Sequence, residues 1–145
     1  MTVRVERSFE LPAPPDRVWD FIADPRNRAR SISVVNEFDA TDPEGRRVTW
    51  HVDLPIPLVR RTVRVDTEDV IRRPPEYVKF VGSSKVMEVT GEHTIVETDG
   101  GARLENRFVV DGKLPGVETF FKRNLDDELT NLQRALERDL DRGGA

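Results

Sequence analysis

The clearest hydrophobic pattern in this chain is helical and lies near its C-terminal end, from Pro115 to Asp141. Apolar side chains recur there at steps of three and four residues, at Val117, Phe120, Phe121, Leu125, Leu129, Leu132, Leu136 and Leu140. This spacing places them on one stripe of an α-helix and leaves charged residues, Glu128 among them, on the face toward water. A helix of this length spans roughly 40 Å at 1.5 Å per residue, so we expect it to lie along another element.

Most of the remaining chain alternates polar and apolar residues, which is the period of a half-buried β-strand. The first such stretch runs from Val3 to Leu11. Six further predicted strands, separated by turn residues, cover Ile32–Ala40, Arg46–Leu54, Arg60–Ile71, Glu76–Gly82, Val86–Thr98 and Ala102–Asp111. The Asp99-Gly100 pair before the last strand is the strongest β-hairpin signal in the chain.

A short helical segment separates the first two strands. Pro14-Pro15 suits the first turn of a helix, where the missing N–H of proline leaves no hydrogen bond unmade. The pattern over 15–22 then puts apolar residues on one face, and Asp24-Pro25 ends the segment. Residues 26–31 are polar enough for an exposed turn or a second small helix.

The order of elements predicts an α+β protein. A strand, one or two short helices, about six more strands and a long helix give an antiparallel sheet of about seven strands, whose dry face the last helix must cover. We expect residues 1–145 to form a single domain, because 145 residues suit one hydrophobic core and no linker or repeat interrupts them.

Composition narrows the functional classes. With 34% charged and 37% hydrophobic residues, a pI near 5.3 and no cysteine, the chain has no basic footprint for nucleic acid and no thiolate for a disulfide, a metal or a nucleophile. The N-terminal stretch lacks the pattern of a signal peptide, and no run of about 18 apolar residues occurs. We therefore expect a cytoplasmic, unanchored protein.

Two segments carry a resemblance to a known family. Leu11-Pro12-Ala13-Pro14-Pro15-Asp16-Arg17-Val18-Trp19-Asp20-Phe21-Ile22-Ala23-Asp24-Pro25 and Gly112-Lys113-Leu114-Pro115-Gly116, in this order of elements, resemble the START-like superfamily (SRPBCC, helix-grip) and most closely its polyketide cyclase/dehydrase branch. The resemblance implies a curved sheet that grips the last helix around an apolar cavity for lipids, quinones or polyketides. Both motifs place helix ends and identify no catalytic set.

The implied cavity would be lined by inward positions of the predicted strands and by the first half of the last helix. These positions are Trp50, Val52, Leu54, Ile56, Val63, Val65, Phe80, Val89, His93, Asn106, Phe108, Val117, Phe120 and Phe121. Trp50 and Tyr77 could each present a hydrogen-bond donor to the cavity, although large aromatic side chains on strands commonly serve packing.

Three polar residues share the apolar faces of their strands: Arg7, His93 and Asn106. A buried polar group needs a partner, water or a ligand. His93 could serve as an acid or base in an aldol-type cyclisation, with Arg7 polarising a carbonyl group. Alternatively, a one-residue bulge reverses the faces, or Arg7 pairs with an acid at the sheet edge. No carboxylate accompanies His93 at a recognisable spacing, and we expect no metal and no organic cofactor.

The loop Leu54–Val59 is unusual because two prolines stiffen an apolar turn. It could be a lid, a site of transient membrane or protein contact, or a part of the core. The basic clusters Arg60-Arg61-Arg64 and Arg26-Arg28-Arg30 contain no interleaved aromatic residues, so we interpret them as solvated faces paired with nearby acids and expect no nucleic-acid partner.

Three functions stay open on this evidence. The first is binding or transport of a hydrophobic small molecule between the sheet and the last helix. The second is a cofactor-independent cyclase or dehydrase that uses His93, and the third is a protein-interaction or co-chaperone-like module. A large apolar cavity would favour binding, convergence of His93 and Arg7 would favour catalysis, and an exposed apolar patch over a filled core would favour interaction.

Overall fold

The protein is described from a computed structural model that covers residues 2–57, 59 and 61–143. Within these residues the elements follow in the order β1 (Thr2–Leu11), α1 (Pro15–Ile22), α2 (Pro25–Arg30), β2 (Val35–Ala40), β3 (Arg47–Val52), β4 (Val63–Arg73), β5 (Tyr77–Ser83), β6 (Met87–Thr98), β7 (Gly101–Gly112) and α3 (Val117–Gly143). The predicted succession of elements is confirmed.

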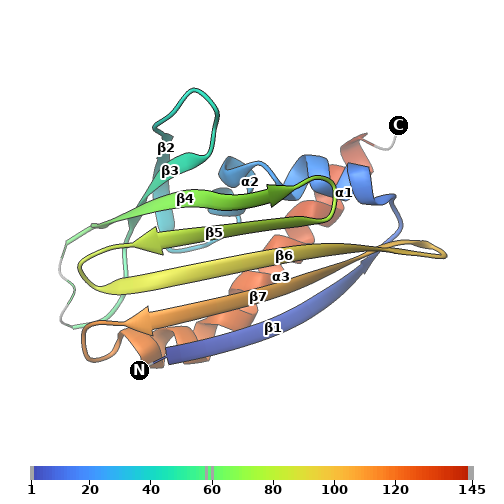
Figure 1. Ribbon diagram of the computed structural model, residues 1–145. Helices are drawn as coiled ribbons and strands as arrows, with labels where there is room; N and C mark the ends of the chain where they lie inside the picture. The colour runs from blue at the N-terminus through green and yellow to red at the C-terminus, as the bar shows by residue number, and fades with distance from the viewer. Residues whose placement is uncertain (1, 58, 60, 144–145) are drawn as a thin grey trace.

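The described strands form one antiparallel sheet of seven strands in the order β1-β7-β6-β5-β4-β3-β2. The first strand pairs with the last, and each remaining strand pairs with its neighbour in sequence. Figure 1 shows the curved sheet in front of α3, with the two short helices α1 and α2 against the same side of the sheet as α3. The predicted sheet wrapped around a long C-terminal helix is therefore confirmed.

Some element boundaries differ from the sequence pattern. The strand predicted from Ile32 begins only at Val35, because the preceding residues connect α2 to the sheet and turn apolar side chains inward. The strand predicted from Arg60 begins at Val63, and Arg60 itself lies outside the described residues. Helix α3 begins at Val117, after Gly116 in a left-handed conformation with φ +94° that favours glycine.

Of the two alternatives expected for residues 26–31, an exposed turn or a small helix, the structure contains the helix. Asp24 caps α2 by accepting a hydrogen bond from the Arg26 backbone N–H at 3.0 Å, and Pro25 occupies its first turn. The Asp99-Gly100 pair forms a two-residue turn between β6 and β7, as the hairpin signal predicts.

Helix α3 packs the predicted stripe against the sheet. Six of its apolar positions are buried: Val117, Phe121, Leu125, Leu129, Leu132 and Leu136. Phe120 and Leu140 are partly buried at the border of the core. Burial of each large apolar side chain stabilises the fold by roughly 1.5–3 kcal/mol. The expectation that Glu128 faces water is wrong, because only 9% of this residue is exposed.

A glycine on β6 makes room for the aromatic centre of the sheet. Gly91 lies opposite Phe80 of β5, and a Cβ atom at Gly91 would lie 2.1 Å from the Phe80 ring. The missing side chain lets that ring lie flat against the inner face of β6. Phe80 can then contact both Trp50 and His93, whose positions decide the chemistry described below.

Among the described residues, no helix is long and apolar enough to cross a membrane.

Candidate functional site

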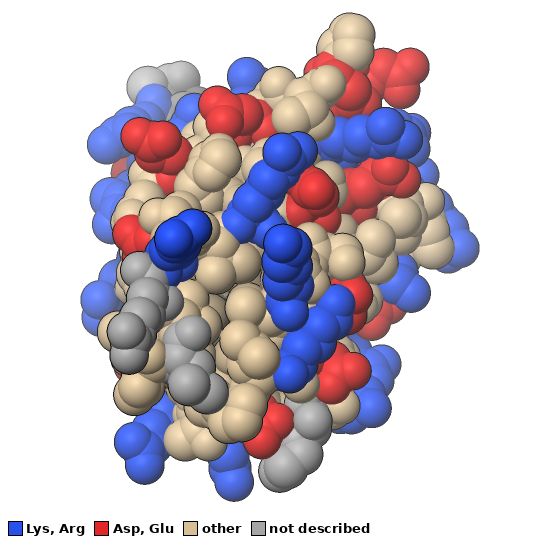
Figure 2. Space-filling view, turned by 90° about the vertical axis from the view of Figure 1, so that its left-hand side faces the viewer, with Lys and Arg blue, Asp and Glu red and all other residues tan. Residues whose placement is uncertain are grey.

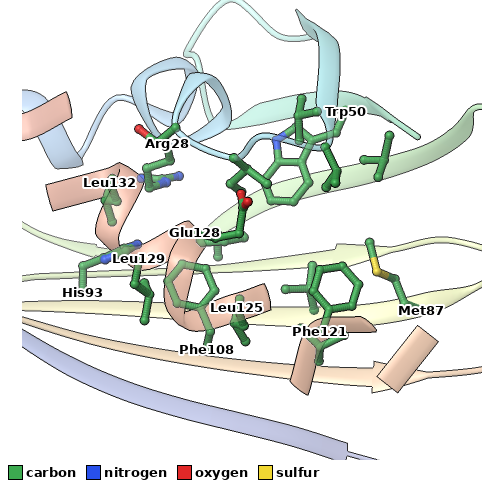
Figure 3. Close-up of a pocket in the computed structure, with 18 residues that line it drawn as sticks. Arg28, Trp50, Met87, His93, Phe108, Phe121, Leu125, Glu128, Leu129 and Leu132 are labelled. Carbon is green, nitrogen blue, oxygen red and sulfur yellow. The ribbon is translucent and has the colours of Figure 1, made fainter. Parts of the chain in front are cut away.

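A cavity of about 40 Å³ lies between the inner face of the sheet and α3 (Figure 3). Its walls combine the middle strands, α2 with its connection to β2, and the first half of α3. Seven of the residues expected from the sequence line it: Trp50, Val52, Phe80, Val89, His93, Phe108 and Phe121.

The other expected residues lie elsewhere in the core. Leu54, Val65, Asn106 and Val117 are buried away from the cavity, and Ile56, Val63 and Phe120 are only partly buried. Val65 packs beside Gly82 on the neighbouring strand.

Sequence reasoning missed eleven lining residues. They are Arg28, Ser31, Ile32, Val34, Val35, Met87, Val110, Leu125, Glu128, Leu129 and Leu132. The apolar members among them share the faces of predicted elements, and helical or strand periodicity could have found them. Arg28 and Glu128 gave no such signal, because both belong to stretches whose other charged residues face water.

Arg28 is buried inside the cavity wall, with 4% of the residue exposed. Its guanidinium donates to the backbone oxygen of Ile22 at 2.8 Å and forms an ion pair with the buried carboxylate of Asp69 on β4. It also lies 5.1 Å from the centre of the Phe80 ring. The interpretation of Arg26-Arg28-Arg30 as a solvated face is therefore wrong for Arg28. Burial lowers the pKa of its guanidinium, and the charge of Asp69 opposes this shift.

Glu128 closes the cavity wall from the side of α3. Its carboxylate accepts a hydrogen bond from the backbone N–H of Ser33 at 2.6 Å and a second one from the Ser33 hydroxyl. We call this pair the Glu128–Ser33 clasp. It holds the connection between α2 and β2, residues 31–34, against the helix. Hydrogen bonds to a charged acceptor are among the stronger ones in proteins, so the clasp favours a closed cavity.

His93 on β6 is completely buried and has one hydrogen-bond partner. Its Nδ1 atom lies 2.7 Å from the Oδ1 atom of Asn106. The Asn106 amide nitrogen donates to the backbone oxygens of Arg7 at 3.1 Å and Leu104 at 3.4 Å, so its oxygen must face the histidine. The Nδ1 atom therefore carries the proton.

The remaining ring nitrogen of His93 is a hydrogen-bond acceptor. Burial, together with the positive charge of Arg28, lowers the pKa of His93 to about 3, although the hydrogen bond that His93 donates to Asn106 acts in the opposite direction. The imidazole is consequently neutral near pH 7, with a lone pair on Nε2.

Two buried polar atoms have no hydrogen-bond partner among the described residues: Trp50 Nε1 and His93 Nε2. Both side chains line the cavity, and in Figure 3 they stand on opposite sides of it. The Phe80 ring contacts both side chains, with its centre 5.8 Å from that of Trp50 and 6.3 Å from that of His93. Because buried polar groups in proteins nearly always have partners, these two atoms mark a place where a bound molecule can supply them.

The hypothesised catalytic pair is not brought together. The Arg7 guanidinium binds the backbone oxygen of Asp126 at 3.1 Å and the Thr130 hydroxyl on α3, outside the cavity lining. The Arg7 guanidinium also forms an ion pair with the carboxylate of Asp126 at 3.3 Å. Arg7 thus has a structural ion pair, as the alternative proposed, but the acidic partner lies on α3 and not at the sheet edge. With a pKa of about 3, His93 is also a weak base at neutral pH.

Tyr77 lies on the opposite face of the sheet from the cavity, since the buried positions of β5 are Val78, Phe80 and Gly82. Its hydroxyl donates to Glu92 on β6, and burial with this bond raises the pKa of Tyr77 to about 12. Of the two predicted aromatic donors, only Trp50 reaches the cavity.

In the Leu54–Val59 loop, the described aliphatic residues pack toward the core, whereas Pro55 and Pro57 are exposed. Leu54 is buried, Ile56 and Val59 are partly buried against the core, and Leu58 lies outside the described residues. An open groove adjoins this loop and is lined in part by Arg61, Arg64 and Lys85. Figure 2 shows this end of the molecule, with lysine and arginine side chains gathered across its middle. Arg64 pairs with Asp66 at 3.0 Å, as expected for a solvated basic face.

Among the described residues, no group of three or more His, Cys, Asp or Glu side chains could hold a metal ion.

A curved antiparallel sheet closed over a long C-terminal helix, with an apolar cavity between them, defines a START-like protein with the helix-grip fold. Residues 2–137 match the family described as polyketide cyclase/dehydrase and lipid transport, and the chain belongs to this family. The resemblance seen in the sequence is thus confirmed. A search of curated proteins finds no match.

Solved structures show the same fold over the whole chain. A START superfamily protein from Mycobacterium smegmatis has a TM-score of 0.74 at 14% identity, covering 96% of this chain and 97% of that one. A conserved protein from Geobacillus kaustophilus has a TM-score of 0.75 at 14% identity, with 97% and 96% covered. The Zhui aromatase/cyclase from Streptomyces sp. R1128 has a TM-score of 0.71 at 17% identity, with 100% of both chains covered.

Proposed function

We propose that this protein binds a hydrophobic small molecule, acting as one domain with its ligand between the sheet and α3. The observation that carries the proposal is the enclosed apolar cavity that contains two buried polar atoms without partners, Trp50 Nε1 and His93 Nε2. A core that served stability alone would satisfy such atoms or replace them with apolar ones. Membership in a family that includes cyclases and lipid transporters supports the same function.

The cavity must expand to accept a ligand. Its volume of about 40 Å³ holds a few water molecules at most, whereas ligand pockets commonly measure about 300–1,000 Å³. The structure therefore represents a contracted state under this proposal. The wall that we expect to move is the connection of residues 31–34, because it lies outside the strands and helices. Opening it would break the Glu128–Ser33 clasp and the hydrogen bond from the Asp53 backbone N–H to the Val34 oxygen at 3.0 Å.

A direct test is native mass spectrometry of the freshly purified protein, followed by extraction of any bound small molecule. A thermal-shift screen with lipids, quinones and aromatic polyketides tests binding of added molecules, since a ligand that binds only the folded state raises the melting temperature. A co-purified apolar molecule or a clear shift would support the proposal. Failure of both experiments would contradict it.

Two neighbouring phenylalanines offer a matched pair of variants. Phe121 lines the cavity, whereas Phe120 lies beside it in sequence but outside the lining. Phe121→Ala should enlarge the cavity toward roughly 150 Å³, a size that accepts a benzene-sized apolar molecule. We expect benzene to raise the melting temperature of Phe121→Ala and not of Phe120→Ala. Equal shifts in both variants would show that benzene does not bind in the space that the Phe121 ring vacates.

The observations favour binding over the two alternatives. The side chains expected to catalyse a cyclisation, His93 and Arg7, do not meet in the cavity. Among the described residues the exposed large hydrophobic side chains are Val70 and Val81, which are too few to form an apolar docking patch.

A further inference from the structure

The two buried polar atoms of the cavity have opposite hydrogen-bonding characters. The indole N–H of Trp50 can only donate a hydrogen bond. His93 Nε2 can only accept one, because the bond between Nδ1 and Asn106 Oδ1 places the single proton on the other nitrogen. A molecule that satisfies both atoms must therefore carry an acceptor at one end and a donor at the other.

The space between these atoms has an aromatic floor. The Phe80 ring contacts Trp50 edge-on and stacks at 17° on the His93 ring, and Phe108 packs edge-on against His93 at 5.6 Å. The two distances from Phe80 limit the separation of the indole and imidazole centres to about 12 Å. A flat molecule of about two fused rings stays within this upper limit, and its faces can pack on the aromatic side chains.

We propose that the cavity selects a flat apolar molecule that donates a hydroxyl hydrogen to His93 Nε2 at one end and accepts the Trp50 indole N–H on a carbonyl oxygen at the other. This inference rests on the proposed function, since it concerns the same cavity in its expanded state. It assigns Trp50 and His93 as positions that determine specificity, while the surrounding leucines and valines supply affinity without selection. The buried, neutral His93 acts here as a fixed acceptor.

Four probes of one skeleton separate the contributions: naphthalene, 2-naphthol, 2-acetylnaphthalene and 6-acetyl-2-naphthol. Their affinities are measured by titration calorimetry with the wild-type protein, Trp50→Phe and His93→Leu. Naphthalene serves as the reference for each variant, so that any change in cavity size cancels from the comparison. Circular dichroism establishes that each variant is folded.

For the wild-type protein we expect the hydroxyl and the acetyl group each to raise affinity about two- to tenfold over naphthalene, the net value of one hydrogen bond. Trp50→Phe should lose the gain from the acetyl group and keep the gain from the hydroxyl group. His93→Leu should show the reverse. If His93→Leu does not fold, 2-methoxynaphthalene replaces it, because this ether cannot donate and should lose the gain of 2-naphthol on the wild-type protein.

The outcomes distinguish this inference from the proposed function. Equal affinities for all four probes, or gains that survive in both variants, would overturn the assignment of donor and acceptor while leaving apolar binding intact. No binding of any probe, naphthalene included, would count against the proposed function itself.

Discussion

The pH dependence of stability tests the buried, neutral state of His93. This side chain is completely buried, and its pKa falls to about 3 in the folded protein from an ordinary value of 6.5. Between these values the unfolded chain binds a proton that the folded chain does not, so protonation favours unfolding. The contribution of His93 is fully present above pH 6.5 and is lost progressively as the pH falls toward 3.

The expected loss follows from this difference in pKa. On lowering the pH from 7 to 5, only the unfolded state takes up the proton to an appreciable extent, which lowers the free energy of unfolding by about 2 kcal/mol. Carboxylates also begin to titrate in this range, so the wild-type protein has to be compared with a variant. His93→Gln removes the titrating group and retains an N–H donor for Asn106.

Urea unfolding followed by tryptophan fluorescence at pH 5, 6, 7 and 8 measures this effect. The wild-type protein should lose about 2 kcal/mol more than His93→Gln between pH 7 and pH 5. His51→Gln is the matched control, because His51 lies partly exposed on the other face of the sheet beside Asp39 and its replacement should leave the loss in place. Equal losses for the wild type and His93→Gln would refute the buried, neutral histidine.

Three further predictions concern the cavity walls. Gly91→Ala should destabilise the protein by about 1–3 kcal/mol in urea unfolding, because its methyl group displaces the Phe80 ring, whereas Gly100→Ala meets nothing within 4 Å and should have little effect. Arg28→Met should destabilise the protein by about 1.5–3 kcal/mol, because the buried Asp69 carboxylate loses Arg28 but keeps Arg72 at 2.8 Å, whereas the exposed Arg26→Met should cost less than about 1 kcal/mol. Similar costs would contradict the buried ion pair. Ser33→Ala removes the hydroxyl half of the Glu128–Ser33 clasp. This variant should bind 2-naphthol with a faster association rate in stopped-flow fluorescence, and an unchanged rate would exclude residues 31–34 as the gate.

Much of the fold follows from local patterns that the sequence carries by itself. The stripe from Val117 to Leu136 and the alternation along the strands specify which side of each element is dry, and Asp99-Gly100 specifies a hairpin. These features depend on spacing along the chain, so they can be recognised without knowledge of distant contacts. The family resemblance and the helix-grip arrangement were predictable for the same reason.

The chemistry of the cavity was decided only by the tertiary structure. Arg28 and Glu128 belong to stretches that are charged on average, and their burial depends on Asp69 and Ser33, which lie far away in sequence. The proton of His93 is located by Asn106 on the neighbouring strand, and Arg7 is drawn away from the cavity by partners on α3. A sequence pattern reports which face a side chain occupies, but the partner that binds its polar atoms is set by contacts between elements, and those contacts exist only in the folded protein.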